Sequence, residues 1–233
     1  MPARMTEEVL KELDQMMDRL NKGDVDERQL ITTRLIDYEK SGKITVAALL
    51  EMADEGNPTM AMYAVVALGR SKHPAAAQKL IDLAEEYRTR HPMFTETVVD
   101  ALGETGDKAA TPLLMEFLGI KSGWKSKLLG KFSLKKEEPS EEEKGFRTYI
   151  ALPAMRALAK LADPRAAEAF SAYLEHEDSL VRWHAVQGIV ACGLTDFIGR
   201  LARMGQSDPD ALVREAAQIA VERMQSPPPQ MVN

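Results

Sequence analysis

Few side chains that could do acid–base or metal chemistry lie near one another in the sequence. The histidines are spread over predicted turns and helices: His73, His91, His176 and His184. One of them belongs to a run of potential ligands, His176-Glu177-Asp178. A metal site needs three or four such groups converging on one point, and short polar runs more often form turns, so we interpret this run as a turn. The sequence thus predicts no catalytic residue, no metal site and no cofactor.

The single cysteine excludes two other kinds of site. Because Cys192 has no second cysteine to pair with, the chain has neither an intrachain disulfide framework nor a multi-cysteine zinc site. It lies beside Ala191 in a helical stretch, where a buried small side chain is expected. The chain has no apolar run of 18 residues and no apolar signal-peptide core near Met1. These features predict a cytoplasmic protein.

The overall charge argues against nucleic acid as a partner. Lys and Arg number 30, Asp and Glu number 36, and the net charge is -6. Sequence-independent binding of nucleic acid depends on many Lys and Arg contacts to phosphates, which an acidic chain supplies poorly. With 45% hydrophobic residues in a chain of 233, enough apolar surface can be buried for a folded protein.

One stretch is distinctive because it is both basic and aromatic. Residues 121 to 136 contain six lysines and no acidic residue, and five glutamates follow around Pro139. Apolar and basic side chains alternate in it with a period of two, which is typical of an extended segment with one apolar and one basic face. Its candidate partner-binding residues are Trp124, Lys125, Lys127, Leu128, Lys131 and Phe132.

Two interpretations of this stretch stay open. In one, it is a disordered insertion whose apolar residues fold back on the rest of the protein, since long surface insertions cost little free energy. In the other, residues 121 to 136 form a docking arm for an acidic protein partner or for peripheral contact with an anionic membrane. Lysines at about 1 kcal/mol each attract such a membrane only modestly.

The elements that must position these residues are helices. Most predicted helices begin at a capping residue or a proline, such as Thr45 or Pro58, and many end at a glycine, such as Gly42. On these signals the helices cover about 6–22, 26–40, 46–55, 58–70, 74–88, 92–103, 107–118, 146–161, 164–175, 179–192, 195–204 and 209–225.

A recurring pair of residues, usually small and then apolar, marks the centre of every second helix. The pairs are Leu35-Ile36, Ala67-Leu68, Ala101-Leu102, Ala157-Leu158, Gly188-Ile189 and Ala220-Val221, with steps of 32, 34, 56, 31 and 32 residues. The long step contains segment 120–145, and removing about 25 residues restores the period. Small residues at these positions would let adjacent second helices approach closely.

Twelve helices in six hairpins of this period predict an all-α fold. The architecture is an α-solenoid, or α-α superhelix, in which each hairpin covers its apolar face with its neighbours. We expect a single solenoid domain over residues 1–225, with one long insertion at 120–145 in repeat four that is lysine-rich and then glutamate-rich. A proline-rich flexible tail is expected over residues 226–233.

Two motifs resemble those of a known family. They are Ala101-Leu-Gly-Glu-Thr-Gly-Asp-Lys-Ala-Ala-Thr-Pro-Leu-Leu and the pair Asp178-Ser-Leu-Val-Arg182 and Asp210-Ala-Leu-Val-Arg214. These are similar to HEAT repeats of the short type that is also seen in phycobilisome lyases. The resemblance implies an armadillo-type solenoid and a concave surface formed by the second helices. It also implies a ladder of aspartates and arginines along those helices, which in this chain is confined to the C-terminal end because repeats one to four lack the arginine.

The same resemblance implies which positions would meet a partner. Residues equivalent to Trp183 form one row: Leu30, Met62, Glu96, Leu152, Trp183 and Glu215. Four residues further on lies a second row: Arg34, Val66, Asp100, Arg156, Gln187 and Ile219. If the rows face the concave side, they form a groove suited to a peptide or a protein helix; alternatively, they pack between repeats. The candidate contacts are Arg156, Trp183 and Gln187.

Enzymes of this architecture are the alternatives. HEAT-repeat deoxyhypusine hydroxylases hold iron with repeated His-Glu pairs, whereas this chain has one such pair, at His176. HEAT-like DNA glycosylases use a basic concave face with tryptophans, and this chain has Trp124 and Trp183 but an acidic balance. A phycobilin-lyase-type subunit would need a second subunit and a bilin, and no motif selects it.

The function that the sequence favours is therefore a non-catalytic scaffold for protein–protein interaction. It would bind a protein or peptide partner through the concave second-helix surface and the basic, aromatic insertion. Self-association also stays open, because methionine-rich surfaces adapt to many partners.

Overall fold

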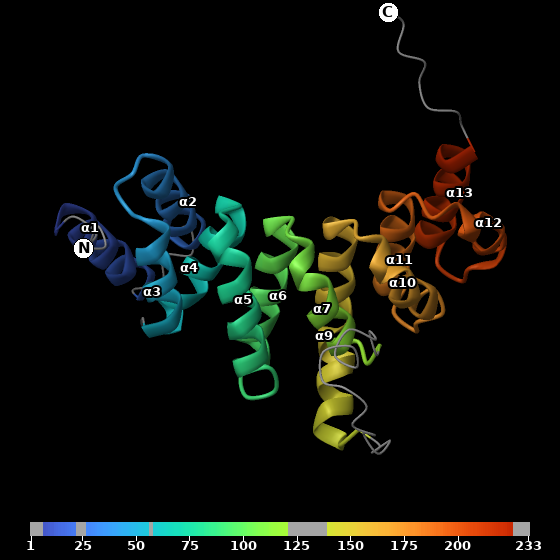
Figure 1. Ribbon diagram of the computed structural model, residues 1–233, viewed down its shortest axis with the longest axis horizontal. Coiled ribbons are helices and arrows are strands. Elements are labelled where there is room, and N and C mark those ends of the chain that lie inside the picture. Colours follow the sequence, from blue (N-terminus) through green and yellow to red (C-terminus); the bar gives the residue numbers. More distant parts are fainter. Residues whose placement is uncertain (1–6, 22–26, 56–57, 121–138, 226–233) are drawn as a thin grey trace, which may run out of the picture. The chain divides into compact units, whose positions relative to one another are not determined.

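The computed structural model describes residues 7–21, 27–55, 58–120 and 139–225. Those residues form twelve α-helices and three short 3-10 turns, with no strand among them. The chain divides into two compact units, residues 1–110 and 111–233, and each contains three helical hairpins (Figure 1). The fold is the all-α solenoid that the repeat period predicts. The expectation of a single domain over 1–225 stays a prediction.

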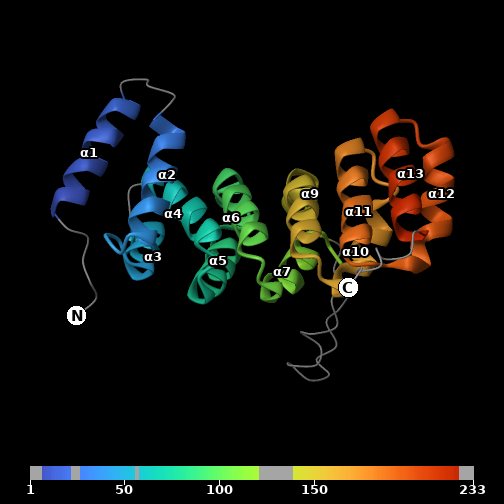
Figure 2. The same cartoon turned by 90° about the horizontal axis from the view of Figure 1, so that it is seen from above.

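Unit 1 consists of three hairpins whose second helices pack side by side. Its helices are α1 (Glu7–Asn21), α2 (Glu27–Lys40), α3 (Val46–Glu55), α4 (Pro58–Ser71), α5 (Pro74–Tyr87) and α6 (Pro92–Thr105). The middle second helix, α4, packs against α2 on one side and α6 on the other (Figure 2). Leu35, Leu68 and Leu102 of the recurring pairs are fully buried between these helices and their hairpin partners. The recurring pairs therefore mark the core.

Helices in unit 1 begin where the sequence offers a cap. The Oγ1 of Thr45 accepts the N–H of Ala48 at 3.2 Å at the start of α3. The Nδ1 of His73 accepts the N–H of Ala75 at 3.1 Å at the start of α5. These bonds satisfy amides that have no partner inside the helix. At its other end, α6 stops at Gly106, whose φ of 73° is the left-handed conformation that favours glycine.

A close approach between second helices in unit 1 involves Gly69. A Cβ atom added there would lie 2.7 Å from the carbonyl oxygen of Ala101 and 2.8 Å from its Cα. Because the obstacle is backbone, it cannot turn aside as a side chain could. The small residues of the register thus let α4 and α6 pack backbone to backbone.

Unit 2 repeats the hairpin arrangement, with second helices that again lie next to one another. Its helices are α7 (Thr111–Phe117), α9 (Glu141–Leu161), α10 (Ala167–Tyr173), α11 (Ser179–Ala191), α12 (Ile198–Ser207) and α13 (Ala211–Gln225). Short 3-10 turns precede the first helices: η1 (Lys108–Ala110), the last element of unit 1, precedes α7, and η2 (Pro164–Ala166) and η3 (Thr195–Phe197) precede α10 and α12. The predicted helices at 107–118, 164–175 and 195–204 therefore each start as a 3-10 turn. In this unit α11 packs against both α9 and α13.

The longest described helix, α9, begins at Glu141, five residues before the predicted start at Phe146. Ser140 caps it, its Oγ accepting the N–H of Glu143 at 3.2 Å. Three glutamates then occupy the first turn, where the positive end of the helix dipole favours acidic side chains. The acidic block, which suggested a solvated loop, is thus partly a helix start.

No described helix is long and apolar enough to cross a membrane.

A buried ion pair ties successive hairpins of unit 2 together. The guanidinium of Arg182 on α11 donates from Nη2 to Oδ1 of Asp208 at 2.8 Å and from Nε to Oδ2 at 3.0 Å. Both side chains are more than nine-tenths buried. The Nη1 of Arg182 also donates to the carbonyl oxygens of His176 and Glu177 at 2.7 and 2.9 Å. One arginine therefore holds two interhelix turns in register.

Candidate partner-binding surface

The face of α11 that points away from the core carries the predicted contacts Trp183 and Gln187. At about 100° per residue, Leu180, Trp183 and Gln187 share one side of the helix. The buried residues lie on the other side: Val181, Arg182, Ala185, Val186, Gly188 and Ile189. Gly188 faces the first helix, since a Cβ there would overlap the ring of Phe170 on α10. The predicted contacts thus belong to the solvent side of α11.

The neighbouring second helices carry the same three positions. Because the repeat step is known, each position on α11 has an equivalent on α9 and on α13. We call the nine residues the second-helix stripe: Tyr149, Leu152, Arg156, Leu180, Trp183, Gln187, Leu212, Glu215 and Ile219. All nine are half-buried or exposed. Since α11 packs against both neighbours, the stripe runs across three adjacent helices.

Bulky apolar side chains stand exposed along one row of this stripe. Tyr149, Leu180 and Leu212 occupy equivalent positions and are 44%, 50% and 64% exposed. In unit 1 the equivalent residue of α6 is Met93, at 70%. Scattered exposed leucines are ordinary, but large apolar side chains repeated at one register position form a patch, which often marks an interaction site.

Sequence reasoning missed this row although a signal for it was present. The row lies eight residues before the first residue of each recurring pair, and it reads Met93, Tyr149, Leu180 and Leu212 in the last four repeats. Alignment on the pairs would have found it. What the sequence does not supply is the rotation of each helix, which decides whether an apolar residue is buried or exposed.

Two basic residues of α9 act electrostatically on His184, the neighbour of Trp183. His184 follows on α11, and burial lowers the pKa of its imidazole to about 4, with a further contribution from the positive charges of Arg156 and Lys160 on α9. Because an ordinary histidine has a pKa near 6.5, His184 is neutral at pH 7. Its ring meets that of Trp183 edge to face, with centroids 4.8 Å apart. Trp183 is thus held in place by a neighbouring ring.

Three of the nine predicted contacts fall on this surface. Arg156, Trp183 and Gln187 all belong to the stripe. Arg156 on α9 lowers the pKa of His184 on α11, and the two helices pack against each other. The other six lie outside the described residues: Trp124, Lys125, Lys127, Leu128, Lys131 and Phe132. In unit 1, Leu30 of the predicted row is also exposed, at 42%.

The run at His176 has structural roles in the turn before α11. The Nδ1 of His176 accepts the N–H of Asp178 at 3.1 Å, and its ring stacks on Tyr173 with centroids 5.4 Å apart. Asp178 in turn caps α11, accepting the N–H of Leu180 at 2.8 Å. Among the residues that the structure describes, no group of three or more His, Cys, Asp or Glu side chains is placed to hold a metal ion.

The aspartates and arginines of the two motifs do not pair with one another as the expected ladder requires. Asp178 and Asp210 are helix caps, with Asp210 accepting the N–H of Leu212 at 2.8 Å. These backbone hydrogen bonds, with that to Val213 the largest cause, lower the pKa of Asp210. The carboxylate that pairs with Arg182 is instead Asp208, two residues before the motif. Spacing inside the motif therefore does not reveal the ion pair.

Stacked helical hairpins with a repeated small-residue register define an α-solenoid repeat protein. The family model for HEAT repeats matches residues 46–125 and 145–222, which is more than half of the chain. The chain therefore belongs to the HEAT-repeat family.

Two other comparisons add little to this assignment. No curated protein matches the sequence. Among solved structures, the chain is similar to human deoxyhypusine hydroxylase in complex with glycerol, at 17% identity over 92% of this chain and 96% of that one, with a TM-score of 0.32. A score that low carries no argument about a site or an activity.

Proposed function

We propose that this protein is a non-catalytic scaffold that binds a protein partner through the second-helix stripe. The observation that carries the proposal is the row of exposed apolar residues, Tyr149, Leu180 and Leu212, at one register position of three adjacent helices. A stacked solenoid presents such rows on stiff helices, so little backbone ordering opposes binding. HEAT repeats commonly serve protein interactions, which agrees with this use.

The stripe suits a partner helix or peptide with an apolar face. Leu180 and Trp183 are three residues apart on one side of α11, so they form an apolar strip against which the apolar face of a partner helix could pack. Trp183 combines a large apolar body with partial burial, and tryptophans in such settings frequently dominate binding energy. Arg156 and Lys160 near Trp183, and Glu215 on α13, supply charges of both signs that would orient the partner.

The basic, aromatic segment 121–136 would add a second contact. It lies in the sequence between α7 and α9, and its lysines would favour an acidic partner. This part of the proposal depends on sequence alone: the candidate residues are Trp124, Lys125, Lys127, Leu128, Lys131 and Phe132. Peripheral contact with an anionic membrane remains an alternative for this segment, self-association remains one for the protein as a whole, and a cytoplasmic location remains the expectation.

The enzyme alternatives gain no observation in their favour. A DNA glycosylase would need a basic face, whereas the stripe is mainly apolar with mixed charges. A phycobilin-lyase-type subunit would need a bilin site, and none of the residues in the stripe selects a tetrapyrrole.

Affinity purification with matched variants tests the proposal. Leu180→Asp and Leu212→Asp place charges in the apolar row of the stripe without touching the core, and Ala172→Asp, at an exposed residue of the first helix α10, is the control. We expect the two stripe variants to lose a partner that the wild type and the control both retain. If all four proteins recover the same set of partners while remaining folded by circular dichroism, the stripe is not the binding surface.

A further inference from the structure

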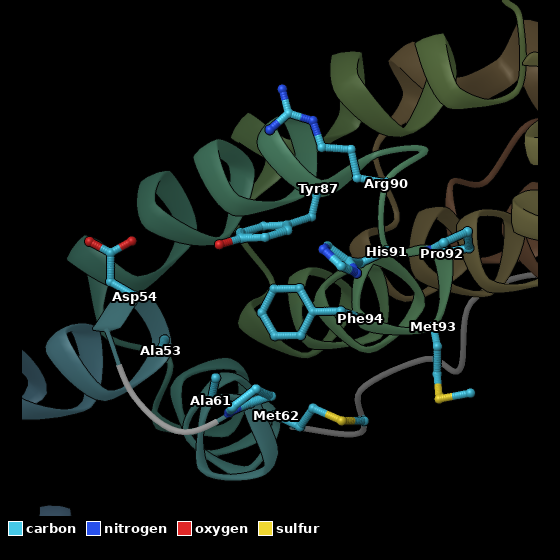
Figure 3. A pocket seen from close by; sticks show the side chains of 11 residues that line it. Ala53, Asp54, Ala61, Met62, Tyr87, Arg90, His91, Pro92, Met93 and Phe94 are labelled. Atoms are coloured by element: carbon cyan, nitrogen blue, oxygen red, sulfur yellow. The ribbon is translucent and has the colours of Figure 1, made fainter.

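A cavity of about 540 Å³ lies in unit 1 between the second and third hairpins. Its walls come from the end of α3, the start of α4 and the turn between α5 and α6 (Figure 3). This volume lies within the range of about 300–1,000 Å³ in which proteins bind small molecules. The cavity is thus large enough to be a ligand site.

One side of the cavity is aromatic. The ring of Tyr87 meets that of Phe94 edge to face, with centroids 5.1 Å apart, and meets that of His91 at 5.5 Å. Figure 3 shows the three rings grouped together, with Ala61 and Met62 below them. Rings held in edge contact leave other edges and faces to which a bound ring can pack at similar distances. The lining therefore favours an aromatic body.

His91 does not cap a helix, whereas His73, at the equivalent place before the preceding helix, does. His73 and His91 each stand directly before a proline that opens a helix. The imidazole of His73 caps α5, accepting the N–H of Ala75, whereas His91 makes no side-chain cap at α6. Its ring instead lines the cavity beside Tyr87. An imidazole freed from capping is available to a ligand.

The charges around the cavity favour an anion. Asp54 on one wall already pairs with Lys79, its Oδ1 lying 2.7 Å from Nζ. Arg90 at the rim is exposed, and within the described residues it makes no salt bridge (Figure 3). Figure 3 shows its guanidinium pointing outward, and a long exposed side chain can change rotamer when a ligand binds. The unneutralised charge at the mouth is therefore positive.

We propose that this cavity binds a small aromatic carboxylate. The ring packs against Tyr87 and Phe94, and the carboxylate reaches Arg90 at the mouth, which forms a charge-assisted pair with it. A cationic ligand of the same shape is disfavoured because Arg90 repels it and Asp54 is already paired. The site is independent of the second-helix stripe, which belongs to unit 2.

Titration of the full-length protein with three matched probes tests this site. The probes are 4-phenylbutyrate, 4-phenylbutan-1-ol and 4-phenylbutylamine, which share a ring and differ in charge. Carbon-13 labels on the methionine methyl groups report binding, because Met62 and Met93 line the cavity. We expect both signals to shift with 4-phenylbutyrate at a dissociation constant of about 0.1–1 mM, as suits a ligand of this size. The alcohol should bind about fivefold more weakly, and the amine more weakly still.

Two substitutions separate the roles of charge and ring. Arg90→Gln should reduce the affinity for the acid to that for the alcohol, while the alcohol is unaffected; Arg203→Gln, at an exposed arginine of α12, is the control that should change neither. Phe94→Leu should weaken both ligands. The proposal is overturned if Met62 and Met93 do not shift at about 10 mM acid, if the amine binds as tightly as the acid, or if Arg90→Gln and Arg203→Gln behave alike. The proposal is also overturned if a peptide that ends in phenylalanine binds the cavity and 4-phenylbutyrate does not.

Discussion

The two units build the same repeat with different contacts between hairpins. In unit 1, α4 and α6 approach backbone to backbone, because Gly69 leaves no room for a Cβ against Ala101. In unit 2, the turns before α11 and α13 are joined by the buried pair of Arg182 and Asp208. A shared helix period therefore does not dictate how the repeats are held together. Unit 1 should be sensitive to added volume, and unit 2 to a lost charge.

The two units also differ in the side chains that they expose. Unit 2 exposes the apolar row of Tyr149, Leu180 and Leu212. The second helices of unit 1 also expose Leu30 and Met93, but they line a hollow that includes the hydroxyl-bearing side chains of Thr33 and Thr97, and the turns of unit 1 surround the aromatic cavity. We therefore propose a protein-binding surface for unit 2 and a small-ligand site for unit 1.

The largest expected effect is on the ion pair of unit 2. Asp208→Ala leaves the buried guanidinium of Arg182 without its carboxylate, and breaking such a pair costs about 3–5 kcal/mol. Equilibrium urea denaturation measures this loss, and hydrogen exchange should locate it in α11 and α13. The control is Asp196→Ala, at an exposed aspartate of η3, which should change stability by less than about 0.5 kcal/mol. Equal effects of the two variants would contradict the role given to Asp208.

The next effect is on the close packing of unit 1. Gly69→Ala forces α4 and α6 apart, and overpacking of this kind costs about 1–3 kcal/mol. Gly145→Ala, in α9 where a Cβ would meet nothing within 4 Å, is the matched control. It should stabilise the protein slightly, since alanine favours helices over glycine by up to about 1 kcal/mol. If both variants stabilise the protein, the helices of unit 1 are not in backbone contact.

A smaller effect concerns the pH dependence of unit 2. The pKa of His184 is about 4 in the folded protein, and an unfolded histidine has a pKa near 6.5. The folded state thus binds fewer protons between these values, so stability falls as the pH drops from 6.5 towards 4. Since the ring is only half-buried, we expect on the order of 1 kcal/mol after screening by solvent.

A histidine variant isolates this contribution to stability. His184→Gln should flatten the fall in stability between pH 6.5 and 4 relative to the wild type. Urea denaturation at several pH values makes the comparison. An unchanged pH profile for His184→Gln would show that its imidazole is protonated as readily in the folded protein as in the unfolded chain.

Much of the fold could be predicted because its signals are local. Caps such as Thr45, prolines such as Pro58 and glycines such as Gly106 mark helix ends within a few residues of sequence. The start of α9 was placed too late because a block of glutamates looks alike in a solvated loop and in a first helical turn. Only Ser140, three residues before Glu143, distinguishes the two.

The candidate sites were harder to predict because they depend on contacts between distant residues. Arg182 pairs with Asp208, 26 residues away, rather than with the aspartates of its own motif. The cavity joins α3 to the turn after α5, and no periodicity in the sequence connects Asp54 with Phe94. Trp183 was predicted as a contact because a tryptophan stands out in a repeat, whereas Leu180 was not singled out because leucines occur throughout the chain.

The central claim is that a protein partner lies on the second-helix stripe, and site-specific photo-crosslinking in cells tests it most directly. A photoreactive amino acid would replace Leu180 or Leu212 in the stripe and, as a control, Arg203 on the first helix α12. The account predicts a discrete crosslinked protein from both stripe positions and none from position 203. The absence of any crosslink from positions 180 and 212, or the same product from position 203, would contradict it.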